Sequence, residues 1–577
     1  MTNKHIKIQT IDPNIMDLVK RSENNPEAII EIFATLQEAR GNLTPSSIQD
    51  VAKAFKIPPA SAYGVASFYS MLNLNEQANN VIRLCDGPVC WLCGAGEGRQ
   101  AVVQAMAEHP DWKIERTSCL GLCDRAPALL INKEQAGPFS LNILSEITQG
   151  WKGKPIEYRE TRKGEIRVMM AEVGLIDPDS LGSALEHGAY RGLKDALNRD
   201  PEIVLKEVEA SGLSGRGGAG FPVGRKWRFV AQAKRNPKYI VCNADESEPL
   251  IFKDRILIDT NPHQILEGMA IAGYACGAHD AFIYIRGEYA SQAERLKHAI
   301  EEAERGGWLG SQIQRSNFSF KIHVHLGAGA YICGEETALI ESLEGKRGEP
   351  RTRPPYPPTA GYHGLPTLVN NVESYAAVPA IIRNGSEWYR SLSGAAIPGT
   401  KIYMLMGHIN QPGLFEAPFG LTLRQLIEDF GGGMKAGSSF YFALTGGAAG
   451  TIVPKELMDI PIDYASGVKG VSMGAGAFLI CDQSVSPVAF LRELLHFFAE
   501  ESCGKCTPCR MGTYRSCEIL SRMVTNKGKP GDVDELYALA EVMFDASFCG
   551  LGQSVPIPMR SALSHFHQIF LDAEIVG

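Results

Sequence analysis

Ser211 to Trp227 reads SGLSGRGGAGFPVGRKW, and the rest of the chain is organised around this stretch. Its glycines leave the backbone bare, so that a flat or phosphorylated ligand can lie against it. Gly215, Gly217 and Gly220 spell G-x-G-x-x-G, which is a weak dinucleotide-binding signal when it stands alone. The residues before it, Pro201 to Ala210, have a helical pattern, so the strand that opens a Rossmann unit is missing. A flexible surface loop therefore stays open as the alternative.

The composition is that of a globular protein with several domains. The chain has 577 residues, of which 44% are apolar, and this length suggests roughly three to five domains. The formal net charge of -8 gives no reason to expect a nucleic-acid partner. No apolar run is long enough to cross a bilayer, and the opening MTNKHIKIQT lacks the apolar core of an export signal. We therefore expect a cytoplasmic protein with no membrane span.

Most of the fourteen cysteines fall into two groups whose spacing is unlike that of a secreted disulfide scaffold. In the first group, Cys85 and Cys90 follow a short strand (VIRL), and Cys119 and Cys123 lie in SCLGLCDRAP. Four thiolates in two loops can hold zinc or an iron-sulfur cluster, because both prefer soft ligands. Gaps of four and three residues beside glycines favour a 2Fe-2S cluster over a zinc ribbon. Cys93 could replace Cys90, which we prefer as the ligand.

The segment from about Pro26 to Asn142 resembles the thioredoxin-like 2Fe-2S subunit of respiratory complex I, the 24 kDa type. The resemblance rests on GVASFYSML, the C-x4-C pair and SCLGLCDRAPALLIN, and the family pattern matches all four ligand positions. It implies a thioredoxin-like domain with a 2Fe-2S cluster. The helical spacing from Pro26 to Leu72 predicts a small helical cap before that domain.

Strands in the middle of the chain are predicted to carry polar residues at their ends. Lys238 to Cys242 (KYIVC) has the pattern of a buried strand, and Ala281 to Arg286 and Lys321 to Leu326 predict two more. Ligands of α/β sheets bind outside the carboxyl ends of the strands. The first strand leads there into NADESEPLIFKDR, with the polar residues Asn243, Asp245, Glu246, Ser247 and Glu248.

A second glycine-rich segment, GAGAYICGEETALIESLEG, follows the third of these strands. Gly327, Gly329 and Gly334 free the backbone, and Glu335 and Glu336 place two adjacent carboxylates at the expected start of a helix. Acidic residues at a helix N-terminus can be simple partners of the helix dipole, and this alternative stays open for one of the two.

A proline-rich loop, RTRPPYPPTAGYHGLPTLVNNVESY, then exposes Tyr356 between prolines. Together these motifs resemble the flavoprotein of complex I, the 51 kDa type, from Tyr190 to Phe566, although EPLIFKDR stands where the family has EPGTFKDR and Ser374 replaces a threonine. By that resemblance FMN would be held by Gly215, Arg216, Gly217, Lys226, Asn243, Asp245, Glu246, Tyr331, Gly334, Glu335, Asn370, Asn371 and Ser374. NAD(H) would contact Gly218, Ala219, Phe221, Phe229, Glu248, Glu336 and Tyr356, with one of the three aromatic rings stacking on the adenine.

The second cysteine group follows a predicted helix with Ser486 as its N-cap. Cys503, Cys506 and Cys509 form C-x2-C-x2-C in ESCGKCTPCR, and Cys549 supplies a distant fourth thiol. This arrangement suits a 4Fe-4S cluster. A zinc site is the alternative on spacing alone, whereas the flavoprotein resemblance implies a 4Fe-4S cluster at these positions.

These observations predict an α/β multidomain fold. The strand Lys401 to Ile409, a hairpin and the helix Leu423 to Asp429 fit a small β-grasp-like domain, which the family also has. The predicted order is an N-terminal helical region (1–75), a thioredoxin-like 2Fe-2S domain (76–148), a linker (149–175), a Rossmann-like domain for FMN and NAD(H) (176–398), a β-grasp-like (SLBB) domain (399–485) and a C-terminal helical bundle with the 4Fe-4S cluster (486–577).

The combination of centres predicts an NADH:acceptor oxidoreductase, or diaphorase. Nicotinamide transfers two electrons as hydride and an iron-sulfur cluster accepts one, so a flavin must stand between them. We expect hydride exchange between NAD(H) and FMN, followed by one-electron transfer to the cluster at the C-terminal cysteines. Glu336 and Glu248 would orient the nicotinamide amide and ribose, and Lys226 would offset phosphate charge or stabilise reduced flavin.

The fusion of both modules in one chain resembles the large diaphorase subunit of soluble NAD-reducing nickel-iron hydrogenases more than it resembles complex I, where the modules are separate. This implies a small diaphorase iron-sulfur subunit and nickel-iron hydrogenase subunits as partners. A fused flavoprotein subunit of an NAD-dependent formate dehydrogenase or of complex I is the alternative. A zinc-stabilised scaffold and a flavin-free electron relay are alternatives from other functional classes.

Overall fold

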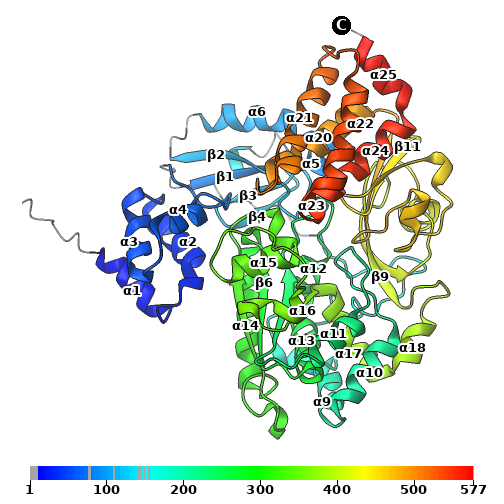
Figure 1. Ribbon diagram of the computed structural model, residues 1–577. Helices are drawn as coiled ribbons and strands as arrows, with labels where there is room; N and C mark the ends of the chain where they lie inside the picture. Colours follow the sequence, from blue (N-terminus) through cyan, green and yellow to red (C-terminus); the bar gives the residue numbers. More distant parts are fainter. Residues whose placement is uncertain are drawn as a thin grey trace, which may run out of the picture.

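The computed structural model describes residues 11–75, 80–107, 109, 111–140, 144–147, 150–151, 153 and 156–575. The opening decapeptide, whose sequence predicts no export signal, and the domain boundaries predicted near 76 and 148 lie outside the described residues. Figure 1 shows an N-terminal helical lobe at one side, two sheets near the centre, a third sheet at the opposite side and a helical bundle at the C-terminus.

The N-terminal lobe is helical, as its apolar spacing predicts. Its helices are α1 (Pro13–Arg21), α2 (Ile29–Arg40), α3 (Pro45–Phe55) and α4 (Pro59–Ala66). After α4 the chain runs against the second glycine-rich segment, because the N–H groups of Ser70 and Met71 donate to the carbonyls of Gly329 and Ala328 over 2.9 and 3.0 Å. The lobe is therefore attached directly to the middle of the protein.

The first sheet belongs to the thioredoxin-like unit and has the strand order β2-β1-β3-β4. The strands β1 (Asn80–Cys85) and β2 (Trp112–Thr117) are parallel, whereas β3 (Leu129–Ile131) and β4 (Glu134–Ala136) are antiparallel. The associated helices are α5 (Pro88–Leu92), α6 (Ala95–Met106) and the short α7 (Leu144–Ile147). Because β1 ends at Cys85, the sheet presents the first cysteine group at its carboxyl edge.

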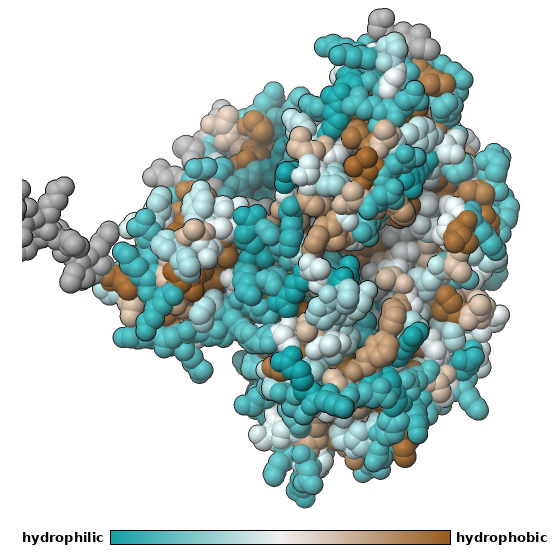
Figure 2. All heavy atoms as spheres, viewed as in Figure 1, coloured by the Kyte–Doolittle hydropathy of each residue, from teal (hydrophilic) through white to brown (hydrophobic). Residues whose placement is uncertain are grey.

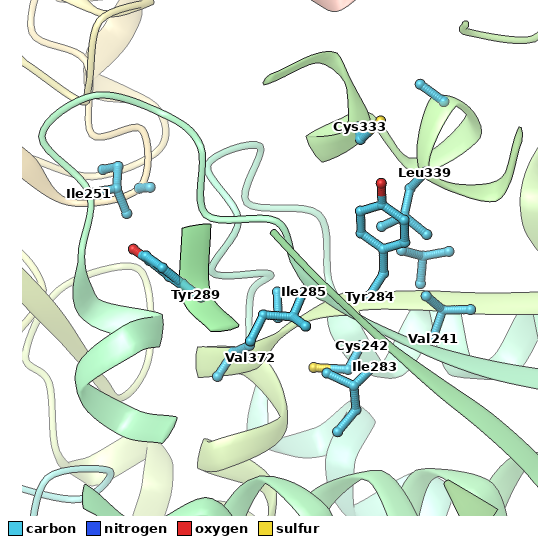
Figure 3. Packing of buried hydrophobic residues seen from close by; sticks show 14 of the residues in the cluster. Val241, Cys242, Ile251, Ile283, Tyr284, Ile285, Tyr289, Cys333, Leu339 and Val372 are labelled. Carbon is cyan, nitrogen blue, oxygen red and sulfur yellow. The ribbon is translucent and has the colours of Figure 1, made fainter. Parts of the chain in front are cut away.

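The central sheet is fully parallel, with the order β7-β6-β5-β8. Its strands are β5 (Tyr239–Ala244), β6 (Asp280–Ile285), β7 (Lys321–Leu326) and β8 (Thr367–Asn371). Around it lie α8 (Leu181–Glu186), α9 (Arg191–Leu197), α10 (Pro201–Ser211), α11 (Val223–Ala231), α12 (Lys253–Thr260), α13 (Pro262–Cys276), α14 (Ala290–Arg305), α15 (Glu336–Leu343), α16 (Pro357–Ala360), α17 (Val372–Asn384) and α18 (Ser386–Ser391). Both faces of a parallel sheet are covered by helices, which explains the apolar strands. Figure 3 shows Val241, Cys242 and Ile283 packed in this core.

The third sheet has the order β10-β9-β13-β11-β12. Its strands are β9 (Thr400–Gly407), β10 (Gly413–Pro418), β11 (Phe440–Thr445), β12 (Thr451–Pro454) and β13 (Ala477–Asp482), and the short α19 (Leu423–Gln425) packs beside them. The expected hairpin is β9–β10, and β13 lies parallel to β9.

The segment predicted as a linker is packed against the third sheet. The N–H groups of Val168, Met169 and Met170 all donate to the Glu416 carboxylate over 2.9 Å, and Ile166 N–H donates to the Glu416 carbonyl over 3.0 Å. The charged composition of the segment did not predict this packing, because the hydrogen bonds are donated by backbone N–H groups. Such bonds do not require an apolar pattern of side chains.

The C-terminal bundle consists of α20 (Pro487–Glu501), α21 (Thr507–Val524), α22 (Asp532–Ala546), α23 (Gly550–Ser554), α24 (Pro556–His565) and α25 (His567–Ile575). The Ser486 side chain caps α20, as predicted, by accepting from Ala489 N–H. α21 and α22 approach closely at Gly512, where an added Cβ would lie 2.7 Å from Met543 Cγ. The turns before α21 and α23 bring the second cysteine group together at one end of the bundle.

Candidate functional site

The candidate site lies at the carboxyl edge of the central sheet, where Asn243 of β5 is in parallel register with Asn371 of β8. A cavity of about 960 Å³ opens here, and a second cavity of about 580 Å³ shares part of its lining. Figure 2 shows a hollow in the middle of this face. Every residue predicted to bind flavin or dinucleotide lines at least one of the two cavities: Gly215, Arg216, Gly217, Gly218, Ala219, Phe221, Lys226, Phe229, Asn243, Asp245, Glu246, Ser247, Glu248, Tyr331, Gly334, Glu335, Glu336, Tyr356, Asn370, Asn371 and Ser374.

The first glycine-rich loop is folded back on itself. Gly215 N–H donates to the Phe221 carbonyl over 2.8 Å, and the Tyr464 hydroxyl donates to the Gly215 carbonyl over 3.0 Å. Gly218 and Gly220 have φ angles of +116° and +67°, in the region that favours glycine. The loop is therefore an ordered wall of the cavity and not a flexible surface loop.

Glu248 and Asp245 are two of the carboxylates that line the second cavity. The Tyr331 hydroxyl and the Ala449 N–H donate to the two oxygens of Glu248, the latter over 2.9 Å, and burial raises the pKa of Glu248. Asp245 Oδ2 is buried without a hydrogen-bond partner, and burial raises the pKa of Asp245 well above its usual range. Because an unpartnered buried acceptor is costly, this oxygen fits a donor on a bound ligand, such as the ring N–H or a hydroxyl of FMN.

Glu246, although it lines the same cavity, is bonded to the protein. Its carboxylate accepts from the N–H groups of Asp254 and Arg255 over 2.7 and 3.0 Å and from the Tyr289 hydroxyl over 3.0 Å. Burial raises the pKa of Glu246 to about 7. Its side chain thus holds the start of α12 in place.

The adjacent glutamates at the start of α15 have different roles. Glu335 caps the helix, because its Oε2 accepts from Thr337 and Ala338 N–H over 3.0 Å, so the helix-partner alternative applies to it. Glu336 Oε2 accepts from Lys226 Nζ over 3.2 Å, and Lys226 also donates to the Val369 carbonyl over 3.1 Å. Both members of this ion pair line the larger cavity and are partly exposed, which leaves them available to a ligand.

Three aromatic rings stand at the mouth of the larger cavity. Phe221, Phe229 and Tyr356 are 41%, 45% and 55% exposed, which is unusual for large apolar side chains. The Arg225 guanidinium lies 6.0 and 5.7 Å from the two phenylalanine ring centres, and Arg353 lies 6.0 Å from that of Tyr356. Exposed rings beside cations suit a planar base with attached phosphates.

The amide and hydroxyl side chains join the loops to the strand ends. Asn243 donates to the Gly334 carbonyl over 2.8 Å, and Asn371 donates to the Asp254 carboxylate over 2.6 Å. Asn370, with its amide oriented to satisfy its neighbours, accepts from the Trp227 indole over 2.9 Å.

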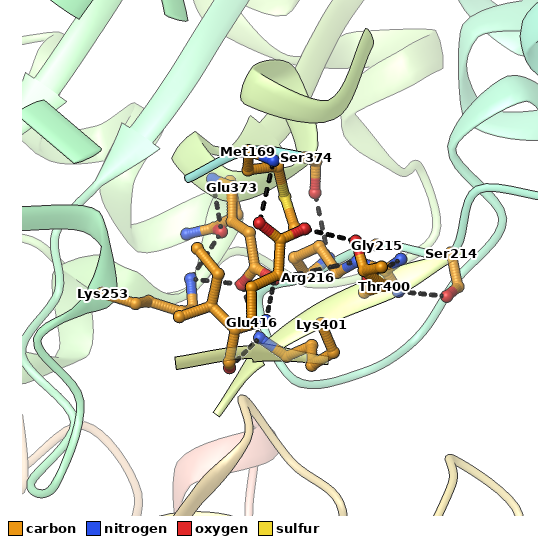
Figure 4. Close-up of polar contacts among 12 residues, drawn as sticks. Met169, Ser214, Gly215, Arg216, Lys253, Glu373, Ser374, Thr400, Lys401 and Glu416 are labelled. Carbon is orange, nitrogen blue, oxygen red and sulfur yellow. Dashed lines mark hydrogen bonds and ion pairs between the residues drawn. The ribbon is translucent and has the colours of Figure 1, made fainter. Parts of the chain in front are cut away.

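The Arg216 side chain points toward Ser214 and Thr400, as Figure 4 shows. Its guanidinium is fully buried and donates to the Ser214 hydroxyl, the Tyr389 hydroxyl and the Thr400 carbonyl, each over 2.8 Å. Only its backbone borders the cavity, where its N–H donates to the Ser374 hydroxyl over 2.9 Å. The side chain anchors the first glycine-rich loop to the third sheet and would not touch FMN.

Sequence reasoning missed the third sheet as part of the site. The turn Gly446–Gly450, Tyr464 and the segment Ser472–Ala475 line the second cavity, as does the buried Lys253 of α12. The glycine-rich TGGAAG sequence at Thr445–Gly450 was the available signal, since bare backbone is expected where a ligand approaches.

The first cysteine group comes together at the end of β1. Cys85, Cys90, Cys119 and Cys123 are buried, whereas Cys93 is exposed, in line with the preference for Cys90. The sulfurs of Cys119 and Cys123 lie 3.5 Å apart. A Cβ added at Gly87 would come within 3.3 Å of Cys119 Cβ and 3.6 Å of Cys85 Sγ, so glycine leaves space beside the sulfurs. Four buried thiols with that space fit a 2Fe-2S cluster.

The second cysteine group lines one small pocket with Ile332 and Leu551. Cys503, Cys506, Cys509 and Cys549 all face this pocket, and the two apolar residues also border the second cofactor cavity. The cysteines therefore adjoin the cavity through a thin apolar wall. Four thiols around one apolar pocket fit a 4Fe-4S cluster.

Comparison with known proteins identifies the parts. Residues 15–152 match the thioredoxin-like [2Fe-2S] ferredoxin family, residues 208–380 the Nuo51 FMN-binding domain, and residues 489–573 the NADH-ubiquinone oxidoreductase-F iron-sulfur binding region. The F 2 subunit of the NADH-quinone oxidoreductase of Rhizobium meliloti is 43% identical over 406 residues, which are 70% of this chain and 96% of that protein. The chain therefore belongs to the flavoprotein family of this NADH-quinone oxidoreductase F subunit.

Two hydrogenase proteins are also similar to this flavoprotein. The NADP-reducing hydrogenase protein HndC of Solidesulfovibrio fructosivorans is 45% identical over 408 residues, covering 70% of this chain and 83% of that protein. A chain of a crystal structure of an NAD+-reducing [NiFe]-hydrogenase superposes with a TM-score of 0.82 at 32% identity, over 95% of this chain and 94% of that chain.

Family membership confirms the predicted fold class and the predicted cofactors. The flavoprotein has an FMN-binding domain, a 4Fe-4S region and a thioredoxin-like 2Fe-2S domain, and it is an NAD(H)-dependent oxidoreductase. A zinc-stabilised scaffold and a flavin-free relay are thereby excluded. In the part of the chain that the structure describes, no helix has both the length and the apolar character needed to span a bilayer.

Gly217→Leu is expected to reduce the FMN content to less than about a tenth of the wild-type value while the chain stays folded. A Cβ at Gly217 meets only Asn371 Cβ, at an ordinary 3.5 Å, but a larger side chain must occupy space in both cavities. Flavin fluorescence after acid release measures the content. Gly394→Leu, at an exposed glycine with open space around it, is the control. Full flavin content in Gly217→Leu would contradict the placement of FMN beside this loop.

Proposed function

We propose that this flavoprotein is the diaphorase subunit of an NAD+-reducing nickel-iron hydrogenase. It exchanges hydride with NAD(H) and single electrons with a small iron-sulfur subunit, which connects it to the nickel-iron subunits. The observation that carries the proposal is coverage: the hydrogenase chain aligns with 95% of this chain, whereas the Rhizobium meliloti relative aligns with 70%. The alignment with the NAD+-reducing hydrogenase chain thus extends over nearly the whole chain, which supports the proposal, although HndC aligns with 70% of it.

The two cavities divide the binding work. One of the rings of Phe221, Phe229 and Tyr356 stacks on the adenine at the mouth. The strand ends and both glycine-rich segments hold FMN through the bare backbone at Gly217 and the unpartnered oxygen of Asp245. Bound FMN supplies the conversion between the two-electron hydride of NADH and the single electrons that iron-sulfur clusters accept.

The charged side chains position the dinucleotide, and the reaction requires no general base. Glu336 accepts hydrogen bonds from ribose or carboxamide donors and is held in place by Lys226, whose Nζ donates to it over 3.2 Å. Glu248 has the same task on the other side, where Tyr331 and Ala449 N–H fix its orientation. Lys226 also offers positive charge to the phosphates. Apolar residues such as Ile332 and Leu551 exclude water between the cavity and the second cysteine group.

The cysteine groups hold the clusters. Cys503, Cys506, Cys509 and Cys549 bind the 4Fe-4S cluster, and Cys85, Cys90, Cys119 and Cys123 bind the 2Fe-2S cluster. We expect the complex in the cytoplasm, where thiols stay reduced.

The proposal is tested by isolating the native complex under anaerobic conditions through an affinity tag on this chain. The expected result is copurification of a nickel-containing subunit and reduction of NAD+ by H2. Copurification of a molybdenum protein with formate-dependent NAD+ reduction would instead assign the chain to a formate dehydrogenase. Copurification of quinone-reducing membrane subunits would assign it to complex I.

Glu336→Ala is expected to raise the KM for NADH about tenfold, because a hydrogen bond between a charged group and the substrate contributes about 1.5–3 kcal/mol. The rate of ferricyanide reduction against NADH concentration measures the effect, and the FMN content is measured in parallel. Glu341→Gln is a matched control on the same helix, since Glu341 pairs with Arg351 and lines neither cavity. An unchanged KM in Glu336→Ala would show that the dinucleotide lies elsewhere.

A further inference from the structure

Glu501, the last residue of α20, joins two distant loops with its two carboxylate oxygens. One oxygen, Oε2, accepts from Tyr331 N–H over 2.9 Å. The other, Oε1, accepts from the Ser118 hydroxyl. These bonds span 170 and 383 residues of sequence. A single side chain thus ties together three segments that the chain brings in from different domains.

Each of the three segments carries part of a different redox site. Ser118 directly precedes Cys119 of the first cysteine group. Tyr331 lines the second cavity and donates its hydroxyl to Glu248, while its ring packs edge-on against Phe497 of α20 at 5.1 Å.

The main chain of Glu501 itself leads to the second cysteine group, which begins two residues later at Cys503. The carboxylate is therefore a junction between the dinucleotide cavity and both cysteine groups. A groove of about 250 Å³, lined by Ser118, Glu501 and Cys503, opens beside it. His496 of α20, whose ring lies 2.9 Å from the Arg116 guanidinium, lines the same groove.

A second side chain, Arg286, makes a similar connection, but it does not reach the second cysteine group. The Arg286 guanidinium donates to the Cys119 carbonyl over 2.6 Å and to the Glu246 carbonyl over 2.7 Å. It connects the first cysteine group with the cavity wall. Glu501, by contrast, belongs to the segment that carries Cys503. Within the described part of the chain, its carboxylate bonds both to the Ser118 loop and to the Tyr331 loop.

We propose that Glu501 is a positioning residue that fixes the separation between the cofactor cavity and the two iron-sulfur sites. The proposal rests on the proposed function, in which electrons pass from the cavity to the cysteine groups. Electron transfer between centres becomes slower as their separation grows, so a residue that fixes the separation affects the transfer rate. Hydrogen bonds near cluster ligands also tune the cluster potentials.

The test compares Glu501→Ala with wild type in the full chain loaded with FMN and both clusters. Stopped-flow absorbance gives the rate of cluster reduction by NADH, and ferricyanide reduction reports electrons taken directly from the flavin. The ratio of the first rate to the second is expected to fall several-fold. The EPR spectra of both clusters, recorded after dithionite reduction, are expected to change.

Two further variants separate positioning from general damage. Glu501→Gln is expected to restore the ratio, because its amide oxygen still accepts from Tyr331 N–H and its amide nitrogen can donate to the Ser118 oxygen. Glu500→Ala removes the same charge from the neighbouring exposed residue, which lines the same groove, and is expected to match wild type. A wild-type ratio and wild-type EPR spectra in Glu501→Ala would overturn the proposal.

If Glu501→Ala does not assemble with its cofactors, Ser118→Ala decides the question, because it removes one arm and leaves the carboxylate in place. An unchanged 2Fe-2S EPR spectrum and an unchanged rate of 2Fe-2S reduction in that variant would overturn the proposal. Failure of the proposed function is distinguishable, since the wild-type chain itself would then fail to reduce its clusters with NADH.

Discussion

Cys549→Ala is expected to remove the 4Fe-4S cluster and to lower the iron content from about six to about two atoms per chain. Cys549 stands directly before α23, far along the chain from Cys503, Cys506 and Cys509, and lines the same small pocket. A cubane that loses one of its four thiolates is exposed at that corner to water and is lost. Iron analysis and the EPR spectrum of the reduced protein measure the change.

The catalytic consequence of Cys549→Ala separates the flavin from the clusters. Ferricyanide takes electrons from the flavin, whereas a partner protein must take them through the 4Fe-4S site. We therefore expect reduction of the native partner by NADH to be nearly abolished, whereas ferricyanide reduction should fall much less. The 2Fe-2S EPR signal should persist, because its four cysteines belong to the first sheet and its loops, whereas Cys549 belongs to the C-terminal bundle.

Cys517→Ala is the matched control for this prediction. Cys517 lies on α21, the same helix that carries Cys509, and it is partly exposed, but it does not line the pocket. It should keep about six irons and both EPR signals. Loss of the 4Fe-4S signal in Cys517→Ala, together with its retention in Cys549→Ala, would reverse the ligand assignment.

Local pattern was sufficient to predict the parts of the fold that depend on nearby residues. The helix after Ser486 begins at Pro487 because serine caps it and proline fits its first turn. The apolar runs before Asn243 and Gly327 are strands of the parallel sheet, and their polar continuations line the cavities. Cysteine spacing within single loops, as in Cys503, Cys506 and Cys509, indicated cluster sites for the same reason, whereas Cys549 joins its group from a distant segment.

The contacts that sequence reasoning missed all join segments far apart in the chain. The Arg216 guanidinium donates to the Thr400 carbonyl, which lies 184 residues later in the sequence. The orientation of the side chain depends on this acceptor, which no local sequence pattern predicts. Val168 and Met169 donate backbone N–H groups to Glu416 nearly 250 residues away, so a charged stretch could pack like a core segment. Such contacts follow from the relative placement of domains, which composition and periodicity do not encode.

Glu373→Leu is expected to destabilise the junction between the central and third sheets by about 3–5 kcal/mol, because it leaves buried cations without their shared anion. The Glu373 carboxylate is fully buried and accepts from Lys401 Nζ and from Ile402 N–H over 3.1 Å. Lys253 Nζ lies 3.1 Å and Arg216 Nε 3.9 Å from it. Figure 4 shows these side chains converging between α17, the first glycine-rich loop and β9.

The charge balance explains the size of the expected effect. Burial works against ionisation of Glu373, but Lys401, Lys253 and Arg216 outweigh it and lower its pKa. A carboxyl whose pKa is lower in the folded state contributes stability above its unfolded pKa and loses it as the pH falls through the folded value. The contribution of the Glu373 carboxylate to the junction should therefore be fully present at neutral pH and be lost only below about pH 4.

Hydrogen exchange followed by mass spectrometry measures this prediction locally, since a chain of several domains does not unfold in one step. Amides of β9 (Thr400–Gly407) and of α17 (Val372–Asn384) should exchange at least about a hundredfold faster in Glu373→Leu. Asp459→Asn removes an exposed partner of Arg424 from the same sheet domain and should leave these amides unchanged. Because Arg216 also positions the first glycine-rich loop through Ser374, Glu373→Leu should release FMN more readily than wild type. Protection of β9 equal to that of wild type would mean that the cations find other partners and that the network does not hold the two sheets together.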